Sequence, residues 1–156
     1  MNKHQPKKMN VAIIGAGIAG LSCANQLKAF GFQVQMYEKS RGASGRMSTR
    51  KTEDWSADHG AQYFTARDPV FLKEINQWIE ADVAAIWNPR LKVFEENQWR
   101  DSHPSEHRYV GTPAMNSPGK HIAQNLPIEF NQTIDRISYD QGAWQLHSLE
   151  SGDITQ

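Results

Sequence analysis

Gly15, Gly17 and Gly20 are the residues whose type and spacing point most directly to chemistry. Together they complete the pattern G-x-G-x-x-G in the stretch GAGIAG. In such a turn the first glycine permits a tight bend, the second lets the backbone approach a pyrophosphate, and the third lets a helix pack close to a strand. The phosphates then lie at the helix N-terminus, where free N–H groups and the helix dipole favour negative charge.

The flanking residues predict the elements that such a turn needs. The apolar run from Val11 to Ile14 is typical of a parallel strand buried on both faces. Apolar residues continue at helical spacing after the glycines, and this helix is expected to bury Cys23 against the sheet. A second strand is expected over residues 33–37 and ends at Glu38, about 20 residues beyond the turn, where an acid can hydrogen-bond a ribose.

The same N-terminal residues also allow a secretory signal peptide. Lys3, Lys7 and Lys8 supply a basic front, and an apolar run leads to Cys23. The three glycines interrupt that run, and each weakens a helix by about 1 kcal/mol relative to alanine. Gly20 also stands where a lipoprotein-type cleavage site needs an aliphatic residue. These features favour the dinucleotide interpretation.

The charge at Glu38 narrows the choice of dinucleotide. A carboxylate accepts from ribose hydroxyls and repels a 2′-phosphate, so NADP is disfavoured, whereas FAD and NAD remain open. The stretch that follows, EKSRGASGRMSTR, contains Arg41 and Arg46, which could place cations against a pyrophosphate or a flavin edge. A solvated turn with incidental arginines is the alternative interpretation of that stretch.

The overall composition indicates an ordinary globular domain. The chain has 156 residues, of which 38% are hydrophobic and 22% are charged. Lys+Arg and Asp+Glu are both 17, so the charge does not indicate nucleic acid or an anionic membrane as a partner. The single cysteine excludes an internal disulfide and fits a reducing compartment, so a cytoplasmic protein is expected. No apolar run approaches the length of a membrane span.

Three blocks of the sequence resemble successive blocks of the flavin-containing amine oxidase superfamily. They are VAIIGAGIAGLSCA, YEKSRGASGRMSTR and ADHGAQYFTAR, and the third resembles the renalase-like branch in particular. This resemblance implies noncovalently bound FAD. It also implies a set of cofactor-binding residues, carried over position by position: Gly15, Gly17, Ala19, Gly20, Glu38, Lys39, Arg41, Arg46, Met47, Gln62, Tyr63 and Phe64. The family often has two glycines before the second arginine, whereas Ser44 stands at the first of those positions here.

The resemblance also implies an α/β fold. A Rossmann-like FAD/NAD(P)-binding domain with a parallel sheet and flanking helices is expected over residues 10–68 and 110–156. Part of a mixed α+β substrate domain is expected over residues 69–109, and a flexible basic N-terminus over residues 1–9. The last residues read as a strand, a turn and the beginning of a returning strand. The chain is therefore expected to be the truncated N-terminal part of a longer enzyme.

Family analogy further implies the reaction. A reduced substrate would deliver hydride to the flavin, and O2 would reoxidise the flavin to give H2O2. The expected substrate is a reduced or isomeric nicotinamide dinucleotide, with an amine as the alternative. A non-catalytic nucleotide-binding fragment and an NAD-binding module without flavin are further alternatives. No residue of this segment is assigned as a catalytic acid or base.

The remaining sequence predicts supporting elements. Asp68 and Pro69 predict the start of a helix whose apolar residues form one stripe. Strands are expected over residues 84–87, 91–94, 108–110 and 127–130, a loop over 97–107, a short helix over 117–125 and a hairpin over 134–149. His59 is expected to be structural. His103 and His107 share an i,i+4 spacing, but Pro104 lies between them, so no metal site is expected.

Overall fold

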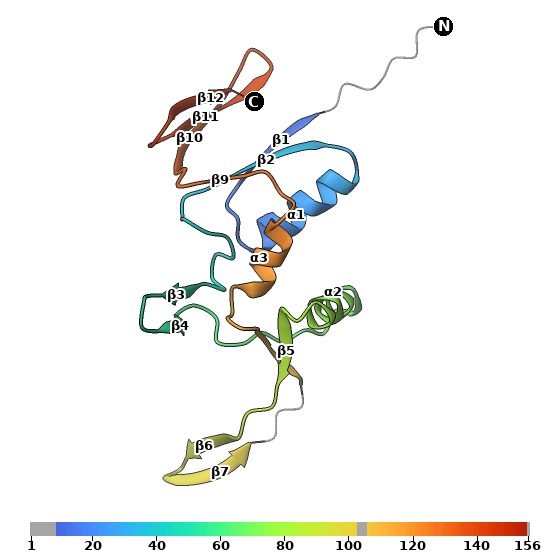
Figure 1. Ribbon diagram of the computed structural model, residues 1–156, viewed down its shortest axis with the longest axis vertical. Coiled ribbons are helices and arrows are strands. Elements are labelled where there is room, and N and C mark those ends of the chain that lie inside the picture. Colours follow the sequence, from blue (N-terminus) through green and yellow to red (C-terminus); the bar gives the residue numbers. More distant parts are fainter. Residues whose placement is uncertain (1–8, 103–105, 156) are drawn as a thin grey trace, which may run out of the picture. The chain divides into compact units, whose positions relative to one another are not determined.

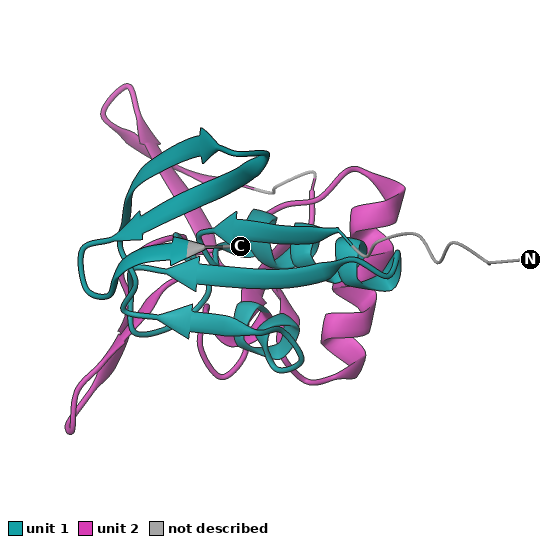
Figure 2. Ribbon diagram, turned by 90° about the horizontal axis from the view of Figure 1, so that it is seen from above, with its two compact units in different colours: residues 1–47, 119–156 teal, residues 48–118 magenta. Residues whose placement is uncertain are grey.

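The computed structural model describes residues 9–102 and 106–155, whose path is shown in Figure 1. Apart from Met9, the basic segment predicted to be flexible lies outside the described residues. The chain divides into two compact units, coloured separately in Figure 2. The first unit comprises residues 1–47 and 119–156, and the second unit comprises residues 48–118. The assignment of FAD and substrate domains along the chain stays a prediction.

The first unit contains the predicted strand–turn–helix–strand. It is built from β1 (Asn10–Ile14), α1 (Ile18–Ala29), β2 (Gln33–Glu38) and β9 (Ile128–Phe130). The strands pair in the order β1-β2-β9, and both pairings are parallel. The short helix α3 (Ser117–Ala123) begins at the unit boundary and leads to β9. The expected α/β fold with a parallel sheet is confirmed.

Two details of this first unit differ from the expectations. The side chain of Cys23 is exposed, because the buried stripe of α1 runs through Leu21 and Ala24, and Cys23 lies off that stripe. The strand β1 is not buried on both faces. It lies at one edge of its sheet in the described residues, and Ile14 is 52% exposed.

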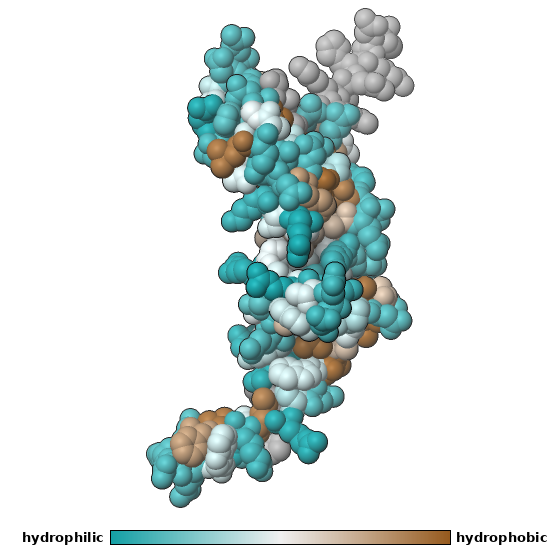
Figure 3. Space-filling model, turned by 60° about the vertical axis from the view of Figure 1, so that its left-hand side comes forward, coloured by the Kyte–Doolittle hydropathy of each residue, from teal (hydrophilic) through white to brown (hydrophobic). Residues whose placement is uncertain are grey.

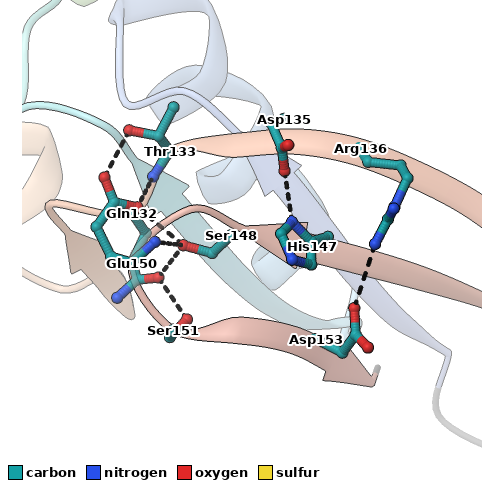
Figure 4. A network of polar contacts seen from close by, with 9 residues as sticks. All are labelled: Gln132, Thr133, Asp135, Arg136, His147, Ser148, Glu150, Ser151 and Asp153. Atoms are coloured by element: carbon teal, nitrogen blue, oxygen red, sulfur yellow. Dashed lines mark hydrogen bonds and ion pairs between the residues drawn. The ribbon is translucent and has the colours of Figure 1, made fainter.

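A separate antiparallel sheet completes the first unit. The strands β10 (Ile134–Asp140), β11 (Ala143–Ser148) and β12 (Gly152–Thr155) pair in that order, as the predicted hairpin and returning strand require. Polar contacts, shown in Figure 4, tie the strands together. The Glu150 carboxylate accepts hydrogen bonds from both the N–H and the hydroxyl of Thr133, and these bonds lower the pKa of Glu150.

The second unit consists of one helix and short antiparallel strand pairs. The pairs are β3 (Thr49–Lys51) with β4 (Ser56–Asp58), β5 (Ala84–Trp87) with β8 (Arg108–Gly111), and β6 (Leu91–Glu95) with β7 (Gln98–Ser102). The helix α2 (Pro69–Glu80) begins where the sequence predicts, because the Asp68 carboxylate accepts from the N–H groups of Val70 and Phe71.

Aromatic residues form the core of this second unit. The Phe64 ring stacks on Tyr109 with centroids 5.7 Å apart, and it meets the edge of Trp78 at 6.2 Å. Trp78 also contacts Phe71, two turns away on α2. The apolar stripe predicted for α2 is therefore the side of the helix that packs in the core.

The strand β7 corrects an expectation, because residues 97–107 were predicted to be a loop. Residues 98–102 instead pair with β6 through a two-residue turn, in which Glu96 and Asn97 both have positive φ, 49° and 63°. Such a turn joins strands directly. Phe94 and Trp99 face each other across this hairpin and are largely exposed. Apolar side chains are accordingly visible on the hairpin at the lower end of Figure 3.

Candidate functional site

The Gly-rich turn (residues 15–20) has the geometry that its glycines predict. Gly15 adopts φ of 99°, a conformation that side chains rarely tolerate, and its N–H donates to the Tyr37 carbonyl at 2.8 Å. A Cβ on Gly20 would lie 2.1 Å from the Gly15 carbonyl oxygen, so only glycine lets α1 start this close to the strand. A Cβ on Gly15 would meet nothing within 4 Å, so the outer side of the turn is open.

A second loop (residues 39–47) packs directly against this turn. The Ser44 N–H donates to the Ala16 carbonyl at 2.9 Å, and Ser44 forms a parallel bridge with Gly17. A Cβ on Gly45 would lie only 3.0 Å from the Gly17 Cα. Gly17 and Gly45 therefore serve the close approach of two backbones. Sequence reasoning missed this contact, although the glycines of both loops were its signal.

Ser44 occupies a position that suits glycine. Its φ is 104° and its side chain is buried. A Cβ on Gly119 would lie 2.8 Å from the Ser44 Cβ, so α3 also approaches this residue closely. The serine that departs from the family pattern is therefore held in a backbone conformation that costs a non-glycine residue free energy.

Glu38 is the buried carboxylate at the end of β2. Its Oε2 accepts from the Ala16 N–H at 2.6 Å, and its Oε1 accepts from the Ser40 N–H at 2.8 Å. Burial alone would raise the pKa of Glu38, but the two backbone hydrogen bonds outweigh burial and hold the pKa below its ordinary value. Glu38 therefore stays ionised and links the Gly-rich turn to the second loop. Its oxygens retain further acceptor sites for hydroxyl groups.

The N-terminus of α1 differs from that of α2. Gly17 is the N-cap of α1, and this helix has neither a side-chain cap nor an acid in its first turn, whereas Asp68 caps α2. The Leu21 N–H is the first to bond inside α1, with the Gly17 carbonyl at 2.9 Å. The N–H groups of residues 18–20 precede this bond at the N-terminus of α1, where an anion would be favoured.

The remaining predicted residues of the first unit surround these two loops. Ala19, Lys39, Arg41 and Arg46 are exposed, and Met47 is half-buried, with its N–H donating to the Ser44 carbonyl. The first unit thus brings together nine of the twelve residues predicted to bind the cofactor, of which three are exposed cations. Their roles toward a ligand stay predictions.

The other three predicted residues lie in the second unit. Phe64 belongs to the aromatic core, and its N–H and carbonyl bond the carbonyl and N–H of Tyr109. Tyr63 lies on the surface beside Trp87, with ring centroids 5.8 Å apart, and the Arg108 guanidinium lies 4.4 Å from its ring centroid. Gln62 is exposed. The contacts of Phe64 therefore lie within the aromatic core, whereas the side chains of Tyr63 and Gln62 are accessible to a ligand.

Asp58 has a structural role in the second unit. Its Oδ1 accepts from the Thr49 hydroxyl and from the Met115 N–H, the latter at 3.1 Å. The neighbouring His59 is exposed. Asp58 therefore fixes the segment before α3 to the β3–β4 pair.

An apolar groove runs along β1, up to Ile14 just before the Gly-rich turn. It has a volume of about 790 Å³ and is lined by residues of β1 and of the β10–β11 hairpin, among them Val11, Ile137 and Trp144. None of the residues predicted to bind the cofactor lines this groove.

Two features are absent from the part of the chain that the structure describes. Those residues contain no group of three or more histidine, cysteine, aspartate or glutamate side chains that could hold a metal ion. His103 of the predicted histidine pair lies outside them. None of the described helices is both long and apolar enough to span a bilayer.

Comparisons with known proteins match this geometry. Residues 13–77 match the family of NAD(P)-binding Rossmann-like domains. The chain is 46% identical over 170 residues to an L-amino-acid oxidase from Sistrurus catenatus edwardsii. This match covers 96% of this chain and 31% of that protein. A 4,4'-diapophytoene desaturase from Staphylococcus haemolyticus is 42% identical over 52 residues, covering 33% of this chain and 10% of that protein.

Solved structures share the fold. A putrescine oxidase bound to putrescine superposes with a TM-score of 0.70 at 10% identity, covering 94% of this chain and 56% of that chain. A protein described as an FAD-containing monooxygenase from Photorhabdus luminescens superposes with a TM-score of 0.61 at 16% identity. The match covers 94% of this chain and 37% of that chain. The present chain thus spans about a third of the length of the first oxidase relative. Its residues 13–77 form an NAD(P)-binding Rossmann-like domain, and the chain is similar in sequence to an L-amino-acid oxidase and in fold to a putrescine oxidase.

Proposed function

We propose that this chain is the FAD-binding part of a flavin-dependent oxidoreductase of the amine oxidase type. The observation that carries the proposal is the Gly-rich turn, whose open side meets the uncapped N-terminus of α1 beside an ionised Glu38. Such a turn suits a pyrophosphate, and such an acid suits a ribose. The similarity to L-amino-acid oxidase over 96% of the chain supports a flavin rather than a plain NAD ligand.

The residues present fit an FAD molecule. The α1 N–H groups after Gly17 would hold the pyrophosphate, and Glu38 would accept from the adenosine ribose. Because Glu38 is ionised, it would repel a 2′-phosphate, so NADP fits this site poorly. Arg41 and Arg46 are exposed and can supply cations to the phosphates. We also propose that Met47, in the first unit, lies near the ring of the flavin, whereas the roles of Gln62 and Tyr63 stay predictions.

The cofactor would supply the redox chemistry. FAD, when bound, would supply two-electron chemistry in which the substrate loses a hydride and O2 takes up the two electrons with two protons to form H2O2. The chain's own residues would bind and orient the dinucleotide. Two substrate classes remain within this proposal. One is an amine or amino acid, supported by the oxidase relatives, and the other is a reduced or isomeric nicotinamide dinucleotide, expected from the renalase-like third block. A cytoplasmic location, expected from the single cysteine, is part of the same proposal.

The visible absorption spectrum of the purified chain after incubation with FAD tests the proposal. We expect the bands of oxidised flavin to stay with the protein through gel filtration and to be released on denaturation. NAD⁺ and NADP⁺ should not displace them. We expect Glu38→Gln to weaken FAD binding about tenfold, because a hydrogen bond to a charged acceptor contributes on that scale. The conservative variant Lys28→Arg, outside the two loops, is the control.

Two outcomes would contradict the proposal. Binding of NAD⁺ without FAD would indicate a plain NAD module. Because the chain spans only part of its relatives, the spectrum should also be recorded on a C-terminally extended chain. Failure of both forms to take up FAD would show that the flavin interpretation is wrong.

A further inference from the structure

The second unit presents a cation, the side chain of Arg108, on a surface that also carries the aromatic rings of Tyr63 and Trp87. Phe64 and Tyr109 form a pair that exchanges two backbone hydrogen bonds, and Trp87 stands opposite Arg108 in the β5–β8 pair. Because side chains alternate between the two faces of a sheet, Phe64 and Tyr109 point into the core, while Tyr63 and Arg108 lie on the outer face. Trp87, opposite Arg108, shares this outer face. We call Tyr63, Trp87 and Arg108 the outer cluster.

Arg108 has no carboxylate partner among the described residues. The ion pairs found there involve Arg67, Lys92, Arg100, Arg136 and His147, but not Arg108. The acid two positions before it, Glu106, already pairs with Arg67 at 2.6 Å. Arg108 is half-buried, whereas the other arginines that form no ion pair among the described residues, at positions 41, 46, 50 and 90, are exposed. A partly desolvated guanidinium with no counterion favours an anion.

The contact of Arg108 with Tyr63 determines which part of the guanidinium remains available to a ligand. Its guanidinium lies over the Tyr63 ring, with 4.4 Å between the central carbon and the ring centroid. A guanidinium whose central carbon lies over a ring can still offer N–H groups at its edge to two oxygens of one ligand. The same contact disfavours an organic cation as the ligand, because the Arg108 charge already lies beside the Tyr63 ring that such a cation would contact.

We infer that the outer cluster is an anion-recognition site. Arg108 would bind two oxygens of a carboxylate or phosphate, and Trp87 would contact the body of the same ligand. The binding of an anion here does not depend on the proposed function. Only the identification of that anion as the substrate rests on it. Within that function, Arg108 selects an amino acid or a phosphate-bearing dinucleotide over a simple amine.

The test follows the Arg108 side-chain N–H resonance by NMR in the whole chain. The chain is titrated with L-phenylalanine, phenyl phosphate and phenylethylamine, which share an aromatic ring but differ in the anion. We expect one or both anionic ligands to shift the resonance to saturation, and phenylethylamine to leave it unmoved. A stronger response to L-phenylalanine would identify a carboxylate ligand, and a stronger response to phenyl phosphate would identify a phosphate ligand.

Matched variants make the result specific. We expect Arg108→Lys to weaken anion binding about tenfold, because lysine keeps the charge but loses the planar fork. Binding of the three probes to each variant is measured from the shift of the Trp87 indole N–H resonance. Arg90→Lys, at an exposed arginine, should leave the affinity unchanged. Near-ultraviolet circular dichroism of the aromatic core checks that each variant is folded.

The inference is overturned if phenylethylamine binds as well as the two anions, if no probe binds, or if Arg108→Lys binds like the unchanged chain. Since no flavin is needed, the result is separable from the proposed function. Anion binding by a chain that takes up no FAD would contradict that function and keep the site. FAD uptake without anion binding would support the proposed function and overturn the anion site.

Discussion

At the scale of single residues, Ser44 shows how a small departure from a family pattern acts through the backbone. The residue is buried with φ of 104° and holds the second loop against the Gly-rich turn. A side chain in this region crowds its own backbone, at a cost of about 1–2 kcal/mol. The chain therefore tolerates strain at the point where its two proposed phosphate-binding loops meet.

A comparison of two variants isolates this strain. Ser44→Gly and Ser44→Ala both remove the hydroxyl, but only glycine relaxes the positive φ. We expect the glycine variant to be the more stable of the two by about 1 kcal/mol. Chemical denaturation of both variants measures the difference. Equal free energies of unfolding would show that the backbone at this position is unstrained.

Glu38 gives a second prediction at this scale, in its dependence on pH. The folded-state pKa lies below the ordinary value of 4.5, so folding favours the ionised carboxylate. Its contribution to stability is fully present above pH 4.5 and is lost as the pH falls through the lowered folded-state pKa. The variant Glu38→Gln lacks this titration. It should be less stable by about 2 kcal/mol at neutral pH, because two backbone hydrogen bonds lose a charged acceptor.

Denaturation curves recorded from pH 7 down to acid compare the two proteins. The gap in unfolding free energy should be constant above pH 4.5 and narrow below it. A gap that stays constant throughout this range would contradict the assigned role of the carboxylate. Glu129, an exposed acid on β9, provides the control through Glu129→Gln.

At the scale of elements, the β6–β7 hairpin offers a direct test of turn chemistry. Both residues of its turn, Glu96 and Asn97, have positive φ, for which an asparagine–glycine pair is preferred. We expect Asn97→Gly to stabilise the hairpin, by about 0.5–1 kcal/mol. Slower amide hydrogen exchange over residues 91–102 would show it. Asn88→Gly, outside the hairpin, controls for a general effect of glycine, and faster exchange in Asn97→Gly would contradict the turn assignment.

The same turn explains which elements could be predicted from the sequence. The β10–β11 hairpin was predicted from Asp140-Gln141-Gly142, where Gly142 has φ of 83°. The β6–β7 turn contains no glycine, so the sequence predicts β6 as a strand but β7 as a loop. The cap of α2 and the Gly-rich turn were predictable because each depends on residues close together in the chain.

Contacts between distant segments could not be predicted in this way. The bond from the Ala16 N–H to Glu38 spans 22 residues, and the approach of Gly45 to Gly17 spans a comparable stretch. Glu38 was predicted as a ligand of a ribose, yet its contacts with both loops depend on how the loops fold over β2. The pairing of Trp87 with Arg108 likewise depends on strands that a hairpin and further residues separate.

At the scale of the whole molecule, the two compact units have separate cores. Ile75 is fully buried within the second unit, in which residues 48–118 are continuous in sequence. Ile122, on α3, is buried within the first unit, which is assembled from two separate segments. These two isoleucines allow the same chemical change to be made in each core.

We expect Ile75→Val and Ile122→Val each to remove about 1 kcal/mol of stability, since each deletes one buried methyl group. If the cores open independently, Ile75→Val should accelerate amide exchange about fivefold in residues 48–118 and leave β1 and β2 unchanged. Ile122→Val should do the reverse. Exchange measured by mass spectrometry on peptides from both units distinguishes the cases. If either variant accelerated exchange equally in both units, the chain would open as one cooperative body, and its two cores would not be separable in stability.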